Sequence, residues 1–186
     1  LLVEIQQEAT RLDRSLSALR LPGPDLALWI ELQQHVRRSL PAFCGSDGHG
    51  GVLEYHDGLT SAVTMIVAPP EGLGIAQRAR WVREHLERGE SLCVDEGMGR
   101  PGVLELALDH GRCELAIDAQ LPDDAHWELL AGTERVAEGR SNARIAASAD
   151  QIYSIRAWRS ISLGWLGSVE RLWVTGPARS TFDLSC

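Results

Sequence analysis

The spacing of apolar residues changes along this chain, from a helical period near its start to a period of two after residue 89. In the first twenty positions apolar residues recur at steps of three and four, which predicts a helix with one narrow apolar stripe. Proline and glycine at positions 22–24 end this helix, since proline cannot continue it. Asp25 is suited to cap a second helix that extends to about Leu40. These two segments predict an N-terminal helical hairpin. The first stripe consists of Leu2, Ile5, Ala9, Leu12, Leu16 and Leu19.

The next part of the chain predicts a loop, a hairpin and a third helix. A glycine-rich loop extends from Cys44 to Gly51. Asp57-Gly58 then separates two apolar runs, 52–56 and 59–67, which is typical of a two-residue β-hairpin. After a proline and glycine turn, residues 73–88 carry apolar side chains at helical spacing. We therefore expect a third helix there.

After Gly89 the pattern predicts short strands joined by turns rich in Gly, Pro and Asp. Such strands at regular spacing are typical of an antiparallel sheet or a β-sandwich. The expected fold class is α+β, with the helical hairpin and the third helix packed on that sheet. We expect a single domain over residues 1–186, with a sub-boundary near 89–91. The expected strands cover residues 92–95, 103–108, 113–117, 126–131, 135–137, 143–147, 151–159 and 169–174.

Composition narrows the chemistry that this chain can perform. All 18 basic residues are arginine, so Schiff-base catalysis and lysine-dependent phosphate sites are excluded. The net charge is −8, which disfavours general binding of nucleic acid. Residues 1–134 hold 22 of the 26 acidic residues, whereas residues 135–186 are net basic. We expect the basic part to dock on the acidic part of the same chain or on a sister subunit.

The four cysteines, Cys44, Cys93, Cys113 and Cys186, are far apart and form no CxxC pair. This spacing excludes a zinc ribbon and a thioredoxin motif. A count of four fits either two disulfides, which could pair in three ways, or four free thiols. Asp109, His110 and Cys113 at a turn are ligand types, but their spacing requires no metal, and neither a metal nor a cofactor is predicted.

The strongest catalytic candidate in the sequence is Cys44, beside the glycine-rich loop. His49 or His56 could act as its base, and Asp47 or Asp57 could orient that base. A glycine-rich loop can also offer backbone N–H groups to an oxyanion. This arrangement defines one alternative function, a thiol-dependent hydrolase.

A second candidate surface lies in the basic C-terminal part. Strand alternation from Gln151 places Arg156 and Trp158 on one face, next to Arg159. Arg and Trp are enriched at protein interfaces, so exposed neighbours of these types predict a contact surface. The alternative is a structural cation–π pair within the fold.

The leading hypothesis is a non-catalytic protein-interaction or assembly domain of a regulatory, adaptor or immunity type. Leu12, Leu16, Leu19, Arg156, Trp158 and Arg159 are its candidate contact residues, and the partner is another protein or a second copy of this chain. An amphipathic N-terminal helix before a β-rich body with a terminal cysteine also resembles exported pilin-like or pseudopilin subunits of secretion or pilus assemblies. No membrane span is predicted, and because the chain starts with leucine we expect a processed or excised product that could have had an upstream anchor. Cytoplasmic and exported locations both remain open.

Overall fold

The computed structural model describes residues 3–7, 24–40, 42–45, 62–66, 68–95, 98–162 and 164–184, with the backbone alone considered for 3–7, 24–27, 42–45 and 62–63. Two α-helices lie within these ranges, α2 (Pro24–Val36) and α4 (Ile75–Glu87), together with a short 3₁₀ turn, η2 (Gly164–Leu166). The strands are β1 (Val3–Gln7), β2 (Ala42–Gly45), β3 (Ala62–Ile66), β4 (Ser91–Asp95), β5 (Val103–Asp109), β6 (Glu114–Gln120), β7 (Ala125–Ala131), β8 (Glu134–Gly139), β9 (Ala143–Ala146), β10 (Ile152–Ser162) and β11 (Ser168–Ser180).

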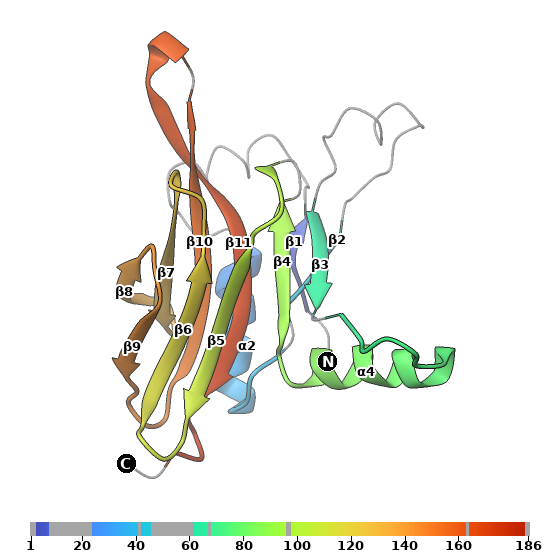
Figure 1. Ribbon diagram of the computed structural model, residues 1–186. Coiled ribbons are helices and arrows are strands. Elements are labelled where there is room, and N and C mark those ends of the chain that lie inside the picture. The colour runs from blue at the N-terminus through green and yellow to red at the C-terminus, as the bar shows by residue number, and fades with distance from the viewer. Residues whose placement is uncertain are drawn as a thin grey trace.

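The fold is built on two antiparallel sheets that face each other (Figure 1). The larger has six strands in the order β3-β4-β11-β10-β7-β8, and the smaller has three in the order β5-β6-β9. A separate parallel pair joins β1 to β2. All the strands expected after residue 89 are present. Strand β4 lies between β3 and β11, so the larger sheet crosses the expected sub-boundary at 89–91.

Buried and exposed residues alternate along β5 and β6, so one face of the smaller sheet is turned toward the core. Leu104 and Leu106 point inward and are buried, whereas Glu105 between them is exposed. Asp109 ends β5, and its Oδ1 accepts hydrogen bonds from the backbone N–H groups of Gly111 and Arg112, which stabilises the turn. The main hydrophobic core lies between the sheets and includes Leu104, Leu106, Leu115, Ile117, Trp127, Leu129, Tyr153, Ile155 and Trp173.

Helix α2 covers part of the opposite face of the larger sheet. Trp29 and Ile30 of the helix pack with Leu130 and Ile152 of β7 and β10 in a second apolar cluster. The central strands are therefore buried on both faces, and the first seven residues of β10 are all buried. A strand of this kind does not show a polar face.

The expected α+β arrangement is wrong in its N-terminal part. Residues Val3–Gln7 form a strand paired with β2 where the first helix was expected, and the described residues before the sheet hold no helical hairpin. Within these five residues Val3 and Ile5 also alternate with polar residues, and β-branched side chains favour a strand when a pairing partner is available. Positions 8–23, which hold the rest of the expected first helix, lie outside the described residues. The chain is mostly β.

The third helix exists but does not pack on the sheet as expected. Its apolar residues Ile75 and Val82 are exposed, Ile75 by 90%. Figure 1 shows α4 extending away from the edge formed by β3 and β4. Local interactions support it instead: Gln77 accepts a hydrogen bond from the Gly74 N–H at its start, and Arg83 pairs with Glu87. The apolar spacing identified the helix correctly but not its surroundings.

Gly139 provides a test of packing between β7 and β8. A Cβ atom at this position would lie 2.5 Å from Cζ2 of Trp127, its neighbour across the strand pair. Trp127 cannot move easily, because it is buried and its Nε1 donates to the Ser141 carbonyl at 2.9 Å. We expect Gly139→Ala to lower the free energy of unfolding by about 1–3 kcal/mol, measured by urea denaturation. Gly111→Ala is the control, since its Cβ would meet only ordinary contacts. Equal stability of the two variants would contradict this packing.

Candidate functional site

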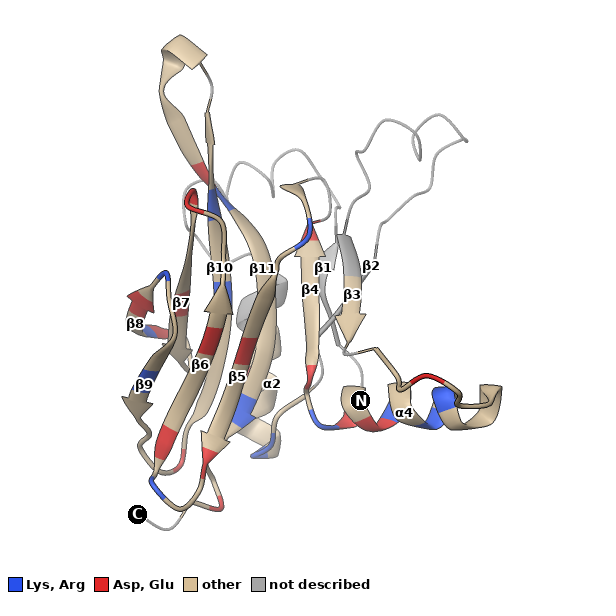
Figure 2. Ribbon diagram, viewed as in Figure 1, with Lys and Arg blue, Asp and Glu red and all other residues tan. Residues whose placement is uncertain are grey.

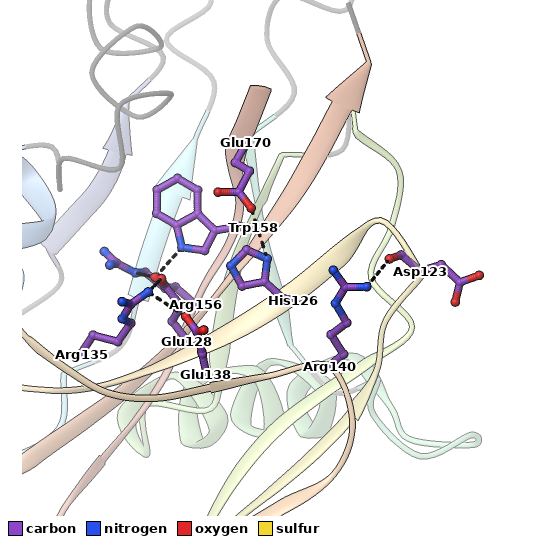
Figure 3. Close-up of polar contacts among 9 residues, drawn as sticks. All are labelled: Asp123, His126, Glu128, Arg135, Glu138, Arg140, Arg156, Trp158 and Glu170. Atoms are coloured by element: carbon purple, nitrogen blue, oxygen red, sulfur yellow. Dashed lines mark hydrogen bonds and ion pairs between the residues drawn. The ribbon is translucent and has the colours of Figure 1, made fainter. Parts of the chain in front are cut away.

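A cluster of polar side chains lies on the face of the larger sheet that also carries α2 (Figure 3). Glu128 of β7 stands in register with Arg156 of β10, and the neighbouring pair is His126 with Trp158. Cross-strand partners share a face of the sheet, so these four side chains lie together. Arg135 of β8 reaches the same carboxylate from the outer strand. We call Glu128, Arg135, Arg156 and Trp158 the Glu128 cluster.

The Glu128 carboxylate is almost fully buried and accepts three hydrogen bonds. Nε of Arg156 donates to Oε2 at 2.7 Å, and Nε1 of Trp158 donates to the same oxygen at 2.6 Å. Nη1 of Arg135 donates to Oε1 at 3.0 Å. The Arg156 guanidinium also lies 5.2 Å from the Trp158 ring, a cation–π contact. The buried carboxylate is thus matched by charged and hydrogen-bonding groups in a largely buried setting.

These contacts set the protonation state of Glu128. Burial alone would raise the pKa of its carboxyl group. The hydrogen bond from Trp158 and the charge and hydrogen bond of Arg156 outweigh burial, so the pKa lies below the ordinary value of 4.5. The group is therefore a carboxylate at neutral pH and balances the buried Arg156 charge.

A polar recess of about 430 Å³ opens beside the Glu128 cluster. In it, Nδ1 of His126 lies 3.7 Å from Oε1 of Glu170, and Arg140 donates from Nη1 to the Asp123 carbonyl at 3.1 Å (Figure 3). A histidine and a carboxylate can transfer a proton, but the side chains that line this recess include no hydroxyl, thiol or amine nucleophile. The lining residues are His126, Arg135, Glu138, Gly139, Arg140 and Glu170.

The second notable feature is a β-hairpin arm, described at residues 160–162 and 164–169, where β10 and β11 extend beyond the sheet (Figure 1). Strand β10 pairs with β7 only as far as Arg159, and from there to Ser162 its register partners are in β11. At the tip, Trp165 is 92% exposed and Leu166 is 65% exposed. No charged residue occurs from position 160 to 169, and Figure 2 shows the projecting tip without charge.

Ion pairs fix the base of the arm. Nε of Arg159 lies 2.9 Å from Oδ2 of Asp124, and Nη2 of Arg171 lies 2.9 Å from Oδ2 of Asp95. The Arg159 guanidinium also covers the ring of Trp173 and donates to the carbonyl of Met98. The arm therefore leaves the body from a base connected to β4 and to the turn before β7.

The structure corrects the expected exposure of the Arg156–Trp158 pair. Both side chains are buried, because this face of β10 is covered, and Nε of Arg156 and Nε1 of Trp158 donate to Glu128. The structural alternative of a cation–π pair within the fold is the one observed. Arg159 lies at the base of the arm and is partly exposed. Leu12, Leu16 and Leu19 lie outside the described residues.

The structure describes only some of the other residues that the sequence predicted to be catalytic, metal-binding or disulfide-bonded. Cys44 belongs to β2, but its side chain is outside the description, as are His49, His56 and Asp57. Asp109 stabilises its own turn, where its Oδ1 accepts a hydrogen bond from the Gly111 N–H. No group of three metal-ligating side chains lies close together among the described residues. Cys113 is disulfide-bonded to a partner outside the described side chains, and Cys93 is a buried thiol that forms no disulfide.

Sequence patterns missed both the Glu128 cluster and the arm. Glu128 stands in an apolar strand, and nothing local indicates that a tryptophan and two arginines meet it. The arm had a signal, since the uncharged run 160–169 contains Gly164 and Gly167 and separates two expected strands. A run of this kind was expected only as a connection, because turn residues do not show how far a hairpin projects.

Comparisons with known proteins gave no relative: no family model, curated protein or solved structure matches the chain. Among the described helices, none has the length and apolar character needed to cross a bilayer.

Glu128 can be tested by removing its charge without changing its size. Breaking a buried ion pair leaves Arg156 uncompensated, so Glu128→Gln should lower the free energy of unfolding by about 3–5 kcal/mol at pH 7, measured by urea denaturation. Because the folded-state pKa is lowered, the stabilisation is present above the ordinary value near 4.5 and is lost as pH falls through the folded-state pKa. The difference between wild type and variant should therefore shrink below that range.

Glu138→Gln is the matched control, since Glu138 is exposed and binds the same Arg135 at 2.7 Å. An exposed pair contributes at most about 1 kcal/mol, so this variant should remain close to wild type. A constant difference between wild type and Glu128→Gln from pH 7 to pH 3 would contradict the assigned charge state.

The cysteine arrangement predicts a specific alkylation count. With Cys113 in one disulfide and Cys93 in none, at most one disulfide can form among the four cysteines. Intact mass after denaturation and alkylation should show two adducts without reduction and four with it. Under native conditions Cys93 should react slowly, because it is buried. No adduct before reduction and four after it would reveal a second disulfide and contradict this arrangement.

Proposed function

We propose that this chain is a non-catalytic protein-interaction or assembly domain whose β-hairpin arm contacts the partner. The exposed tip of the arm is the observation that carries the proposal. Trp165 and Leu166 are large apolar side chains in water, placed on an element that projects from the body (Figure 1). Single exposed apolar residues are ordinary, but a projecting tip without any charge is a recognisable contact surface.

Residue type supports this assignment. Tryptophan is the side chain most enriched among residues whose truncation weakens protein complexes strongly. Its indole ring offers a large contact area with two rotatable bonds, so ordering it costs little entropy. Gly164 and Gly167 have positive φ angles of 65° and 94°, which place the 3₁₀ turn at the tip without Cβ strain.

The base of the arm supports the same function. The Arg159–Asp124 and Arg171–Asp95 ion pairs hold both strands where they leave the sheet. A contact element that is ordered before binding loses less conformational entropy when its partner arrives. All the charge of this region is at the base, which leaves the tip apolar.

The polar recess gives less support to catalysis than the arm gives to binding. Its histidine and carboxylate lack a nucleophile among the lining side chains, and Arg135 is committed to Glu128 and Glu138. The hydrolase alternative based on Cys44 stays a prediction, since its histidines are not described. The pilin-like alternative also stays a prediction: Val3–Gln7 form strand β1, and positions 8–23 of the expected amphipathic helix lie outside the described residues.

Site-specific photo-crosslinking tests the role of the arm. Replacing Trp165 with p-benzoylphenylalanine in the protein's own cells should give one discrete crosslinked product on irradiation. The same replacement at Val136, which is exposed on β8, is the matched control for a surface position away from the arm. Mass spectrometry of the product decides whether the partner is another protein or a second copy of this chain.

The identified partner then permits a quantitative prediction. Trp165→Ala should weaken its binding at least about thirtyfold, which corresponds to roughly 2 kcal/mol, without lowering the melting temperature. Val136→Ala should leave the affinity unchanged. If positions 165 and 136 give the same diffuse crosslinking, or if Trp165→Ala binds like wild type, the arm is not the contact element.

A further inference from the structure

The two sheets of the sandwich differ in width, and a groove follows from that difference. Six strands form one layer and three form the other. At the β3–β4 side, Met65 and Leu92 contact the edge of the core but remain only partly buried. A groove of about 380 Å³ lies there, between these residues and β5. A strip of apolar sheet is thus left without a second layer within the described residues.

One wall of this groove is a strand edge. Six consecutive residues, 102–107, line it, and all but the first belong to β5. Among the described strands β5 pairs only with β6, so it is an edge strand of the smaller sheet. Alternate N–H and C=O groups of an edge strand point away from its neighbour and are available to another strand. A strand added there would extend the smaller sheet over Met65 and Leu92.

Arg179 of β11 adds a positive charge to the apolar lining. Its Nη1 donates to the carbonyls of Ala178 at 2.8 Å and Gly89 at 3.4 Å, and no described carboxylate forms an ion pair with it. Burial lowers the pKa of this guanidinium, and the charges of Glu90 and Glu105 only partly oppose that effect. Glu90 is itself bound to Arg88 at 2.9 Å. Arg179 therefore retains donors for an anionic group.

We propose that this groove binds an extended peptide whose backbone adds to the edge of β5 and whose C-terminal carboxylate pairs with Arg179. Main-chain hydrogen bonds would supply affinity, and side chains at every second position would contact Met65, Leu92 and Leu104. Glu90 and Glu105 line the same groove and disfavour acidic side chains elsewhere in the peptide. The partner is thus an apolar, extended segment with a free carboxyl terminus. This binding site is distinct from the arm.

The probe is a pool of eight-residue peptides with Val, Ile, Leu or Phe at alternate positions, Ser, Thr or Lys between them, and a free carboxyl terminus. The peptide most enriched on the intact protein is labelled with fluorescein, and its affinity is measured by anisotropy. We expect its C-terminal amide to bind at least about tenfold more weakly, because a charge-assisted pair with Arg179 is lost. Hydrogen exchange of residues 103–107 should slow when the peptide binds.

Two variants make the test specific. Arg179→Gln should reduce the affinity for the acid to that for the amide, whereas Arg144→Gln, an exposed arginine on β9, should change neither. Thermal melting of Arg179→Gln checks that it folds. Trp165→Ala should keep full peptide affinity, so failure of the arm and failure of the groove are distinguishable.

Several outcomes would overturn the proposal. The first is that no peptide is enriched on the wild-type protein above its level on the Arg179→Gln protein. The second is equal affinity for the peptide acid and its amide, and the third is peptide binding that does not slow hydrogen exchange in β5. Binding of decanoate, an apolar acid without a peptide backbone, at the affinity of the best peptide would also overturn it, since main-chain pairing would then contribute nothing.

Discussion

The double-sided burial of β10 determines much of this structure. On its inner face Tyr153 and Ile155 join the core between the sheets, and on its outer face Arg156 and Trp158 are covered as well. Both side chains are largely buried, and an unpaired buried donor or cation costs several kcal/mol. The Glu128 carboxylate accepts from both, and through Arg135 it also connects β8. One buried anion therefore links three neighbouring strands of the larger sheet.

The arm follows from a mismatch of strand lengths in the same sheet. Strands β10 and β11 span 11 and 13 residues, whereas β7 spans 7, so the two long strands continue as a ribbon with no third strand beside them among the described residues. A two-stranded ribbon is marginally stable alone in water. The ion pairs of Arg159 and Arg171 lie where the ribbon loses its neighbours, which is where added stabilisation has the largest effect. An apolar tip on such a ribbon costs solubility, and contact with a partner would offset that cost.

Local pattern predicted the strands after residue 89 and failed where tertiary contacts decide. Leu104 and Leu106 lie on either side of the exposed Glu105 because one face of β5 is buried, so the sequence pattern alone predicts this strand. The sequence predicted that β10 is a strand but not which of its faces is buried, since both faces are covered. Val3 and Ile5 fit either period, and pairing with β2 decided between them. The Glu128 cluster joins positions separated by up to 30 residues, and no local pattern encodes such a contact.

The arm and the groove, as proposed contact sites, would recognise partners by different means. The tip of the arm lies beyond Ser162↔Ser168, the last register pair of β10 and β11, so side chains such as Trp165 are what it presents. Specificity there depends on the shape of the partner's pocket. The groove presents the main chain of β5, which pairs with any extended backbone, so its selectivity has to come from the apolar strip and Arg179. Changing side chains at the tip should therefore weaken binding of the arm's partner, whereas in the groove the loss of the Arg179 charge should remove the preference for segments with a free carboxyl terminus.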